Sequence, residues 1–228
     1  MIAITERLAR AFDLARLVHA GDLKKGTATP YVAHLMSVAS LVLSHGGDED
    51  QAIAALLHDV PEDHGGRARL DEIREKFGNE VARIVEACSD TLVANRSDKE
   101  PWWERKVAYI ARLEREDERV LLVSTADKYD NARSVLSDYR NIGEDLWGRF
   151  NKDAGRAGSL WFYQRVSEIS SACLTDTAAA ALASALAGTV REIVDEVRGA
   201  NAPGVVDSDL ADAREQEEIT RRALGLVS

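Results

Sequence analysis

Residues 52–63 read AIAALLHDVPED. The six apolar residues that open this stretch indicate a buried helix. His58 and Asp59 follow directly, and Glu62 and Asp63 come four residues after them, a spacing that brings side chains together on one helix face. Four polar groups at the end of an apolar helix are costly to bury unless a cation or hydrogen bonds compensate them. A bound divalent metal is the simplest explanation, so this stretch predicts a helix that ends at a metal site.

The rest of the chain also shows helical periodicity, with apolar residues three to four positions apart. Pro61 cannot take part in the interior hydrogen bonds of a helix, so we expect the helix to break or restart there. The segment 138–148 is expected to be irregular, and the polar segment 89–101 to be mobile. No stretch alternates regularly between apolar and polar residues, so the chain is predicted to be all-α. The helices are expected at residues 3–20, 30–44, 50–57, 71–77, 80–87, 102–113, 118–136 and 159–171.

The last quarter of the chain has a different composition. Residues 178–187 are rich in alanine, residues 191–198 have the pattern of an amphipathic helix, and residues 199–209 contain the Gly, Pro and small polar residues of a linker. We predict one domain at residues 1–175 and a partly flexible helical extension at residues 176–228. Beyond the linker, the sequence allows either a final exposed helix or a loosely ordered tail. The extension is a candidate arm for a homo-oligomer.

The composition is that of an ordinary globular protein, with 45% hydrophobic and 30% charged residues. The net charge of −10 argues against a duplex nucleic-acid partner, which needs a basic surface, but allows a small anionic substrate beside a metal and local lysines. No apolar run reaches the roughly 18–20 residues of a membrane span, and the first residues lack the pattern of a secretory signal. Cys88 and Cys173 are too few for a disulfide framework, so we expect both to be buried thiols in a cytoplasmic protein.

Two further residues complete the predicted metal site. His34 lies in a predicted helix, and Asp127 ends a second apolar run. Taken alone, His34 is typical of a core or surface histidine, and Asp127 with Lys128 is typical of a surface ion pair. Together with His58 and Asp59 they supply two imidazoles and two carboxylates, which helical bundles bring together from facing helices. This donor set suits Mn²⁺, Fe²⁺ or Zn²⁺ with open positions for hydrolysis.

Other polar residues are candidates for contacts with a substrate. Asn131 lies one helical turn after the last predicted ligand and offers an amide to the substrate or to that ligand. Lys24 and Lys25 lie on the turn that leads to His34, where they are either solvent-exposed charges or contacts for phosphate oxygens. His19 ends the preceding helix and is a candidate to line the same cleft.

These residue types support the hydrolysis of a phosphate ester. A divalent metal lowers the pKa of bound water and polarises a phosphoryl oxygen. Glu62 can act as a general base if burial and carboxylate crowding raise its pKa. Asp63 shares this crowding, so we expect the two carboxyls to titrate as a unit.

The order of these groups resembles the HD-superfamily hydrolase domain of RelA/SpoT-type alarmone enzymes. The resemblance covers roughly residues 5–170 and includes the lysine pair, Pro-Tyr-x-x-His at 30–34, His-Asp-x-x-Glu-Asp at 58–63 and Ala-Asp-Lys-x-x-Asn at 126–131. The length of the chain makes it similar to a stand-alone small alarmone hydrolase. The family usually has Arg-Lys where this chain has two lysines, and lysine holds a phosphate as a point charge rather than as a fork.

The resemblance implies an all-α HD-domain bundle that hydrolyses the 3′-pyrophosphate of ppGpp or pppGpp, the nucleotides of the stringent response. The products would be GDP or GTP and pyrophosphate. The residues that the resemblance implies are His34, His58, Asp59 and Asp127 for Mn²⁺, Glu62 and Asp63 for the attacking water, and Asn131 with Lys24 or Lys25 for the nucleotide.

Two other functions stay open. An HD phosphohydrolase could instead act on a nucleoside monophosphate, pppApp or NADPH, although the Glu62-Asp63 pair favours the alarmone reaction because plain nucleotidases do not need it. A non-catalytic nucleotide-binding regulator is the other alternative, and the complete set of predicted ligands argues against it.

Overall fold

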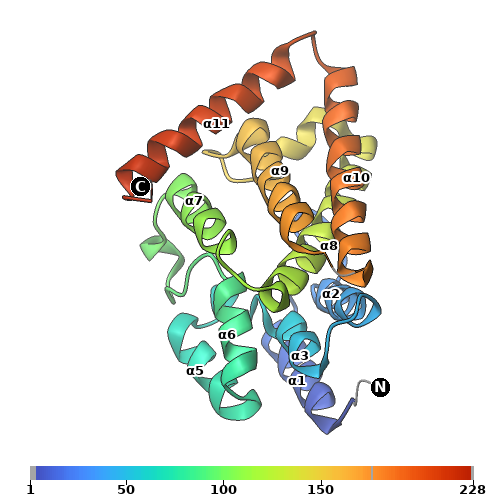
Figure 1. Ribbon diagram of the computed structural model, residues 1–228, viewed down its shortest axis with the longest axis vertical. Helices are drawn as coiled ribbons and strands as arrows, with labels where there is room; N and C mark the ends of the chain where they lie inside the picture. Colours follow the sequence, from blue (N-terminus) through green and yellow to red (C-terminus); the bar gives the residue numbers. More distant parts are fainter. Residues whose placement is uncertain (1–3, 176, 227–228) are drawn as a thin grey trace.

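The computed structural model describes residues 4–175 and 177–226, and within them the all-α prediction is confirmed (Figure 1). The first residue of the helix predicted at 3–20 and the last two residues of the predicted C-terminal helix lie outside the described residues. The first half of the chain forms α1 (Glu6–Val18), α2 (Val32–Ser44), α3 (Glu49–Leu57), α4 (Val60–Asp63), α5 (Gly66–Phe77) and α6 (Asn79–Cys88). The second half forms the 3₁₀-helix η1 (Arg96–Asp98), α7 (Trp102–Leu113), α8 (Glu118–Ile142), the 3₁₀-helix η2 (Gly143–Arg149), α9 (Gly155–Cys173), α10 (Thr177–Ala200) and α11 (Val205–Ala223).

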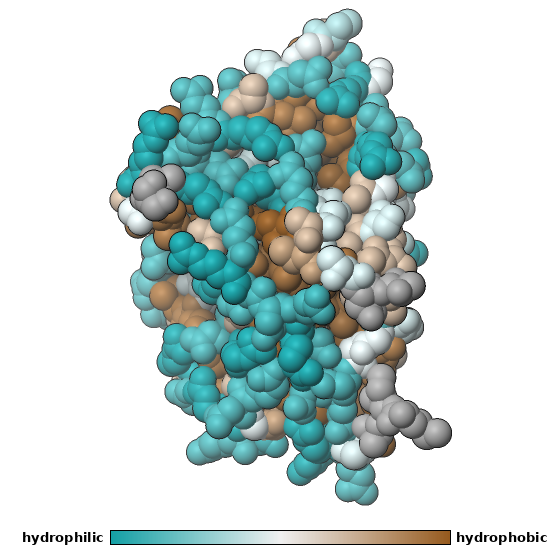
Figure 2. All heavy atoms as spheres, in the orientation of Figure 1, coloured by the Kyte–Doolittle hydropathy of each residue, from teal (hydrophilic) through white to brown (hydrophobic). Residues whose placement is uncertain are grey.

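The helices form two groups that meet at α8. Helices α1, α2, α3, α5 and α6 lie in the lower half of Figure 1, and α7, α9, α10 and α11 lie in the upper half. Helix α8 packs against α2, α3 and α6 of the first group and against α9 and α10 of the second. Figure 2 shows that hydrophilic side chains cover most of this face of the molecule. None of the described helices combines the length and the apolar character that crossing a membrane requires.

The buried helix predicted before His58 is confirmed as α3. A capping box between Asp48 and Gln51 holds its N-terminus. The apolar residues of its last two turns are all buried. Pro61 lies in the first turn of α4, where its missing N–H would have no partner within the helix. The predicted restart at Pro61 is therefore confirmed, and it places the pair His58-Asp59 between two helices.

Helix α8 is longer than the sequence pattern indicated. The predicted end near Leu136 and the irregular segment 138–148 are wrong, because α8 continues to Ile142 and η2 follows it. Val135 and Tyr139 extend the buried face of α8 beyond the predicted end, which explains the additional turns.

The C-terminal extension is helical where the structure describes it. The alanine-rich segment and the amphipathic segment after it form one helix, α10, which packs against α8 and α9. The segment 199–209, predicted to be a linker, contains a short turn and the start of α11. Helix α11 packs against α9 and α7, so the structure has a helix rather than a loosely ordered tail at residues 205–223. The domain boundary near residue 175 and a role in self-association stay predictions.

The two cysteines lie in different environments. Cys88 is buried at the end of α6, as predicted. Cys173 is exposed, contrary to the prediction, because it is the last residue of α9 and lies beyond the buried face of that helix.

Candidate metal centre

The four predicted metal ligands lie together where α2, α3 and α8 meet. His34 is in the first turn of α2, His58 and Asp59 lie between α3 and α4, and Asp127 is in the middle of α8. His58 Nε2 lies 2.9 Å from Asp59 Oδ2 and 3.5 Å from Asp127 Oδ1. His34 Nε2 lies 3.3 Å from the same Asp127 oxygen and 3.7 Å from Asp59 Oδ2. Segments distant in the sequence thus bring two imidazoles and two carboxylates around one point.

The two imidazoles have the geometry of metal ligands. Both residues are buried, with 3% of His34 and 1% of His58 exposed. Their Nδ1 atoms are paired, because His34 donates to Asp130 Oδ2 at 2.7 Å and His58 donates to the Ala55 carbonyl at 2.8 Å. Their Nε2 atoms make no hydrogen bond within the described residues, and the candidate ligand atoms of His34, His58 and Asp59 lie within 4.8 Å of one another. A ring that donates from Nδ1 presents a lone pair at Nε2, so these residues fit a divalent cation.

The charge around this point is negative. Burial lowers the pKa of His58, but the charges of Asp59 and Asp127 outweigh burial and raise this pKa well above its ordinary value. The pKa of His34 is raised too, because the nearby carboxylates of Asp127 and Asp130 outweigh burial, which alone would lower this pKa. The site therefore attracts positive charge, either as protons on the imidazoles or as a divalent cation in their place.

Two further residues of α8 hold Asp127. Asn131, one turn on, donates from Nδ2 to Asp127 Oδ1 at 2.6 Å, and the Lys128 ammonium pairs with Asp127 Oδ2. Lys128 Nζ also lies 5.5 Å from the centroid of the Tyr109 ring. Asp127 is buried and only 13% of the Lys128 side chain is exposed, so the interpretation of this pair as a surface ion pair is wrong. The charge of Lys128 holds the pKa of Asp127 well below its ordinary value although burial raises it.

Tyr31 and Asp130, to which the sequence assigned no role, also contact the predicted ligands. The Tyr31 hydroxyl donates to Asp59 Oδ2 at 2.5 Å. Asp130 accepts from His34 and, at 2.5 Å, from Ser37 Oγ. Burial raises the pKa of Asp130, but these two hydrogen bonds outweigh burial and lower the pKa to about 2. Asp130 lies three residues after the last predicted ligand, on the same helix face, and this spacing was a signal for its position.

Glu62 and Asp63 lie on α4, which directly follows the predicted ligands His58 and Asp59. Glu62 Oε2 accepts from the backbone N–H of Asp90 at 3.3 Å, and Glu62 Oε1 lies 3.4 Å from Lys99 Nζ. Burial and the charge of Asp90 raise the pKa of Glu62 to about 7. Burial and the charge of Asp59 raise the pKa of Asp63 to about 6. Both carboxyls therefore titrate close to neutral pH, where a group can both accept and return a proton.

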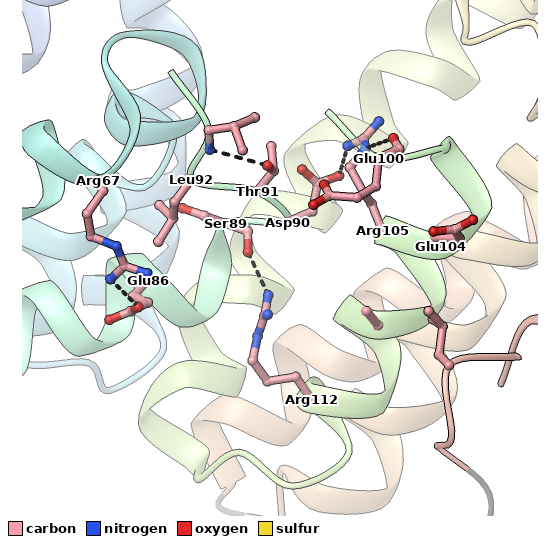
Figure 3. Close-up of a pocket in the computed structure, with 13 residues that line it drawn as sticks. Arg67, Glu86, Ser89, Asp90, Thr91, Leu92, Glu100, Glu104, Arg105 and Arg112 are labelled. Carbon is pink, nitrogen blue, oxygen red and sulfur yellow. Dashed lines mark hydrogen bonds and ion pairs between the residues drawn. The ribbon is translucent and has the colours of Figure 1, made fainter. Parts of the chain in front are cut away.

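Asp90 stays ionised because two basic residues of α7 hold it. Arg105 Nη1 lies 2.5 Å and Lys106 Nζ lies 2.7 Å from Asp90 Oδ2. Figure 3 shows Arg105 reaching from α7 to Asp90 in a separate pocket of about 540 Å³. None of the predicted metal ligands lines this pocket. Asp90 therefore places a negative charge beside Glu62, which contributes to the raised pKa of Glu62.

His19, predicted to line the cleft, belongs to a hydrogen-bonded group beside the centre. His19 Nδ1 donates to Asp22 Oδ2 at 3.0 Å, and His64 Nε2 donates to the same oxygen at 2.7 Å. The His19 and Tyr31 rings lie 5.0 Å apart, centroid to centroid. His64 directly follows α4, the helix that carries Glu62 and Asp63. Asp22 therefore connects the turn after α1 to this helix.

The two lysines of the turn have different environments. Lys24 Nζ donates to Ser134 Oγ at 2.6 Å and to Asp130 Oδ2 at 3.2 Å. Lys25 is exposed and makes no ion pair with any described residue. Both lysines line a cavity of about 640 Å³, which Asp130 and Asn131 also line. Lys24 therefore supports a residue of the metal centre, while the Lys25 ammonium is available to a ligand.

Comparisons with known proteins find relatives for much of the chain. A family model described as HD domain matches residues 11–158. A guanosine-3′,5′-bis(diphosphate) 3′-pyrophosphohydrolase of Aquifex aeolicus is 33% identical over 131 residues, which are 57% of this chain and 18% of that protein. A protein of Synechocystis with the same name, qualified as probable, is 33% identical over 167 residues, which are 72% of this chain and 22% of that protein. The aligned part is thus about a fifth of the length of these relatives.

Two solved structures are also similar. A protein of Listeria monocytogenes EGD-e has a TM-score of 0.58 at 27% identity, and the match covers 73% of this chain and 99% of that one. A metazoan ortholog of SpoT, described as hydrolysing ppGpp, has a TM-score of 0.54 at 21% identity over 100% of both chains. At that identity, the second likeness concerns the fold alone.

Proposed function

Since this chain belongs to the HD-domain family, we propose that it is a metal-dependent hydrolase of the 3′-pyrophosphate of ppGpp or pppGpp. The products are then GDP or GTP and pyrophosphate. One observation carries the proposal: burial and the charges of Asp90 and Asp59 raise the pKa of Glu62 to about 7, and the Nε2 atoms of the buried His34 and His58, which gather around Asp59, have no hydrogen-bond partner in the described residues. The relatives from Aquifex aeolicus and Synechocystis, which are named for this reaction, support the choice of substrate.

The HD domain is a fold that binds divalent metal, and four residues would hold the ion here. They are His34, His58, Asp59 and Asp127. We assign Mn²⁺, with Fe²⁺ and Zn²⁺ as alternatives, because imidazole and carboxylate donors suit all three. When bound, the ion polarises a phosphoryl oxygen and lowers the pKa of water.

Residues of the chain itself transfer the proton, orient the water and bind the nucleotide. Glu62 takes a proton from the attacking water, and Asp63 orients that water with its own carboxyl. The water oxygen forms a bond to the phosphorus on the ribose 3′ oxygen, the bond between that phosphorus and the 3′ oxygen breaks, and the 3′ oxygen takes up a proton. Asn131 and Lys25 hold the nucleotide. Lys24 contributes by supporting Asp130, and thereby His34, rather than by binding phosphate directly.

The test is release of pyrophosphate from ppGpp by the purified protein, with Mn²⁺ and with a chelator. GMP, NADPH and pppApp are assayed beside it, and His58→Ala serves as the variant without a complete metal site. Turnover of ppGpp that requires Mn²⁺ and is absent from His58→Ala is the expected result. Turnover of another nucleotide instead would support the metal centre and contradict the proposed substrate. Binding without any turnover would favour a regulator.

A further inference from the structure

His19, Asp22 and His64 form a second group of side chains that can bind a metal. His19 Nδ1 and His64 Nε2 both lie against one oxygen, Asp22 Oδ2, at 3.0 and 2.7 Å. The candidate ligand atoms of the three residues lie within 4.8 Å of one another. The group shares no residue with the predicted metal centre, and the proposed hydrolysis gives none of the three a role.

The distances in this group suit a metal ion. Bonds from Zn²⁺ to imidazole nitrogen and carboxylate oxygen are about 2.0–2.2 Å long, so two ligands of one ion lie about 3–3.5 Å apart. The separations of the two imidazole nitrogens from Asp22 Oδ2 lie within a few tenths of an ångström of that range. An ion could therefore replace the two hydrogen bonds with little movement of the side chains.

The backbone already holds these residues in place. The Asp22 N–H donates to the His19 carbonyl at 3.0 Å, and the Asp22 carbonyl accepts from the Tyr31 N–H at 2.9 Å. The His64 N–H donates to the Val60 carbonyl at 3.0 Å. Two turns thus present three ligands in a fixed arrangement, which reduces the entropy that binding would cost.

His19 can present a lone pair to a cation. Its side chain is fully buried, and its Nε2 makes no hydrogen bond with any residue that the structure describes. No such bond therefore fixes which ring nitrogen carries the proton. Burial lowers the pKa of His19, although the hydrogen bond to Asp22 and the charge of Asp59 raise it, so the ring is neutral at neutral pH. With its proton on Nε2, the ring offers Nδ1 as a ligand.

The other two ligands are open to solvent. The side chains of Asp22 and His64 are 39% and 34% exposed. An ion can therefore enter from solvent, and water can complete its coordination. Three protein ligands with one open position are typical of Zn²⁺ sites outside closed structural centres.

Tyr31 separates this group from the predicted metal centre. Its ring centroid lies 5.0 Å from that of His19, and its hydroxyl donates to Asp59 Oδ2. The two groups are thus neighbours with separate ligands, and each can be removed by substitution without touching a ligand of the other.

We infer that His19 Nδ1, the Asp22 carboxylate and His64 Nε2 bind a second divalent transition-metal ion, which fastens the turn after α1 to the end of α4. The donor set favours Zn²⁺, because imidazole suits Zn²⁺ whereas Mn²⁺ prefers sites richer in oxygen. The ion would join two segments that are 42 residues apart in the sequence and that the Asp22–His64 hydrogen bond now connects.

The experiment counts Zn²⁺ ions bound by the metal-free, full-length protein, by isothermal titration calorimetry without nucleotide. His64→Gln removes the exposed histidine of the new site, His58→Ala removes a ligand of the predicted centre, and a third protein carries both changes. His45→Gln is the matched control, because the His45 ring donates to the Leu41 carbonyl and belongs to neither group.

The wild type and His45→Gln should bind two ions, each single-site variant one, and the double variant none. At the altered site, affinity should fall by at least about 100-fold, because losing even an outer partner of a ligand costs about 10-fold to 100-fold. Two ions bound with unchanged affinity by His64→Gln would overturn the inference. One ion in the wild type that only His58→Ala loses would overturn it as well.

Thermal unfolding gives a second readout. Zn²⁺ should raise the Tm of His58→Ala and leave that of the double variant unchanged, because only the former keeps a site that the unfolded chain lacks. Equal Zn²⁺ effects on these two proteins would contradict the inference. If His58→Ala does not fold, the ions counted for the wild type and His64→Gln decide.

These measurements also separate the second site from the proposed function. One ion in the wild type that His64→Gln loses and His58→Ala keeps would support the second site and contradict the predicted centre. Because no nucleotide is present, failure of ppGpp hydrolysis would leave the result of the count unchanged.

Discussion

Asp130 Oδ2 lies 2.7 Å from His34 Nδ1, behind the imidazole that faces the other metal-ligand candidates. A carboxylate in this place fixes the orientation of the ring and the position of its proton, and it makes Nε2 a stronger donor to a cation. His58 has a neutral group, the Ala55 carbonyl, in the same place. The two imidazoles therefore differ in the charge of their Nδ1 partners, and the donor strength of His34 Nε2 depends more on its partner than that of His58 Nε2.

Asp130→Asn should lower the affinity for Mn²⁺ about 10-fold to 100-fold, because the amide removes the negative charge behind His34. Isothermal titration calorimetry on the metal-free protein measures this directly. Asp138→Asn is the control, since it makes the same change on α8 at a residue that pairs with Arg149 and touches no ligand. Equal dissociation constants for Asp130→Asn and the wild type would contradict the role of Asp130.

The sequence indicated the predicted metal ligands but not Tyr31 and Asp130, which make hydrogen bonds to them. Among the predicted ligands, His58, Asp59 and Asp127 follow from apolar runs that end in polar residues, and the two carboxyls on α4 follow from local spacing, whereas His34 is suggested only in combination with the others. Helical spacing could have placed Asp130 on the face of Asp127, but the partners of Tyr31 and Asp130 lie 28 and 96 residues away in the sequence, and periodicity within one helix does not reveal such pairs. The length of α8 was underestimated because its polar last turns obscured Tyr139, although Gly143 marks its end with a positive φ.

Glu62→Gln should keep the metal and lose hydrolysis. Glutamine has the same size and can still accept from the Asp90 N–H, but it cannot take a proton from water. We expect kcat to fall by about 100-fold or more, while calorimetry gives an unchanged affinity for Mn²⁺. Wild-type turnover in this variant would exclude Glu62 as the general base.

The metal-free protein should lose stability as the pH rises through the titration range of Glu62. The pKa of Glu62 rises from 4.5 to about 7 on folding, so between these values the folded state holds a proton that the unfolded state has released. The group therefore contributes stability that is fully present below pH 4.5 and is lost as the pH rises through 7.

Urea denaturation in the presence of a chelator measures this contribution. The free energy of unfolding of the wild type, relative to that of Glu62→Gln, should fall by an amount on the order of 1–3 kcal/mol across this interval, because the variant lacks the titrating carboxyl. A difference between the two proteins that does not change with pH would show that Glu62 has an ordinary pKa in the folded state.

Glu217→Ala should destabilise the whole protein through the C-terminal helix. Glu217 on α11 accepts from the buried Trp161 Nε1 at 2.7 Å and pairs with Arg165 and Arg221 at 3.1 and 3.0 Å. Alanine would leave a buried indole N–H and two arginines without this partner, so we expect a loss of about 2–4 kcal/mol in the free energy of unfolding. Glu218→Ala is the matched control, because that neighbouring side chain is 70% exposed, and it should change stability by less than about 0.5 kcal/mol.

A single unfolding transition that shifts as a whole in Glu217→Ala would place α11 in the same cooperative unit as the metal centre, since α9 and α7 lie between them. Equal stabilities for the two variants would mean that the extension unfolds separately from the rest of the chain. The predicted boundary near residue 175 would then separate two units that unfold independently.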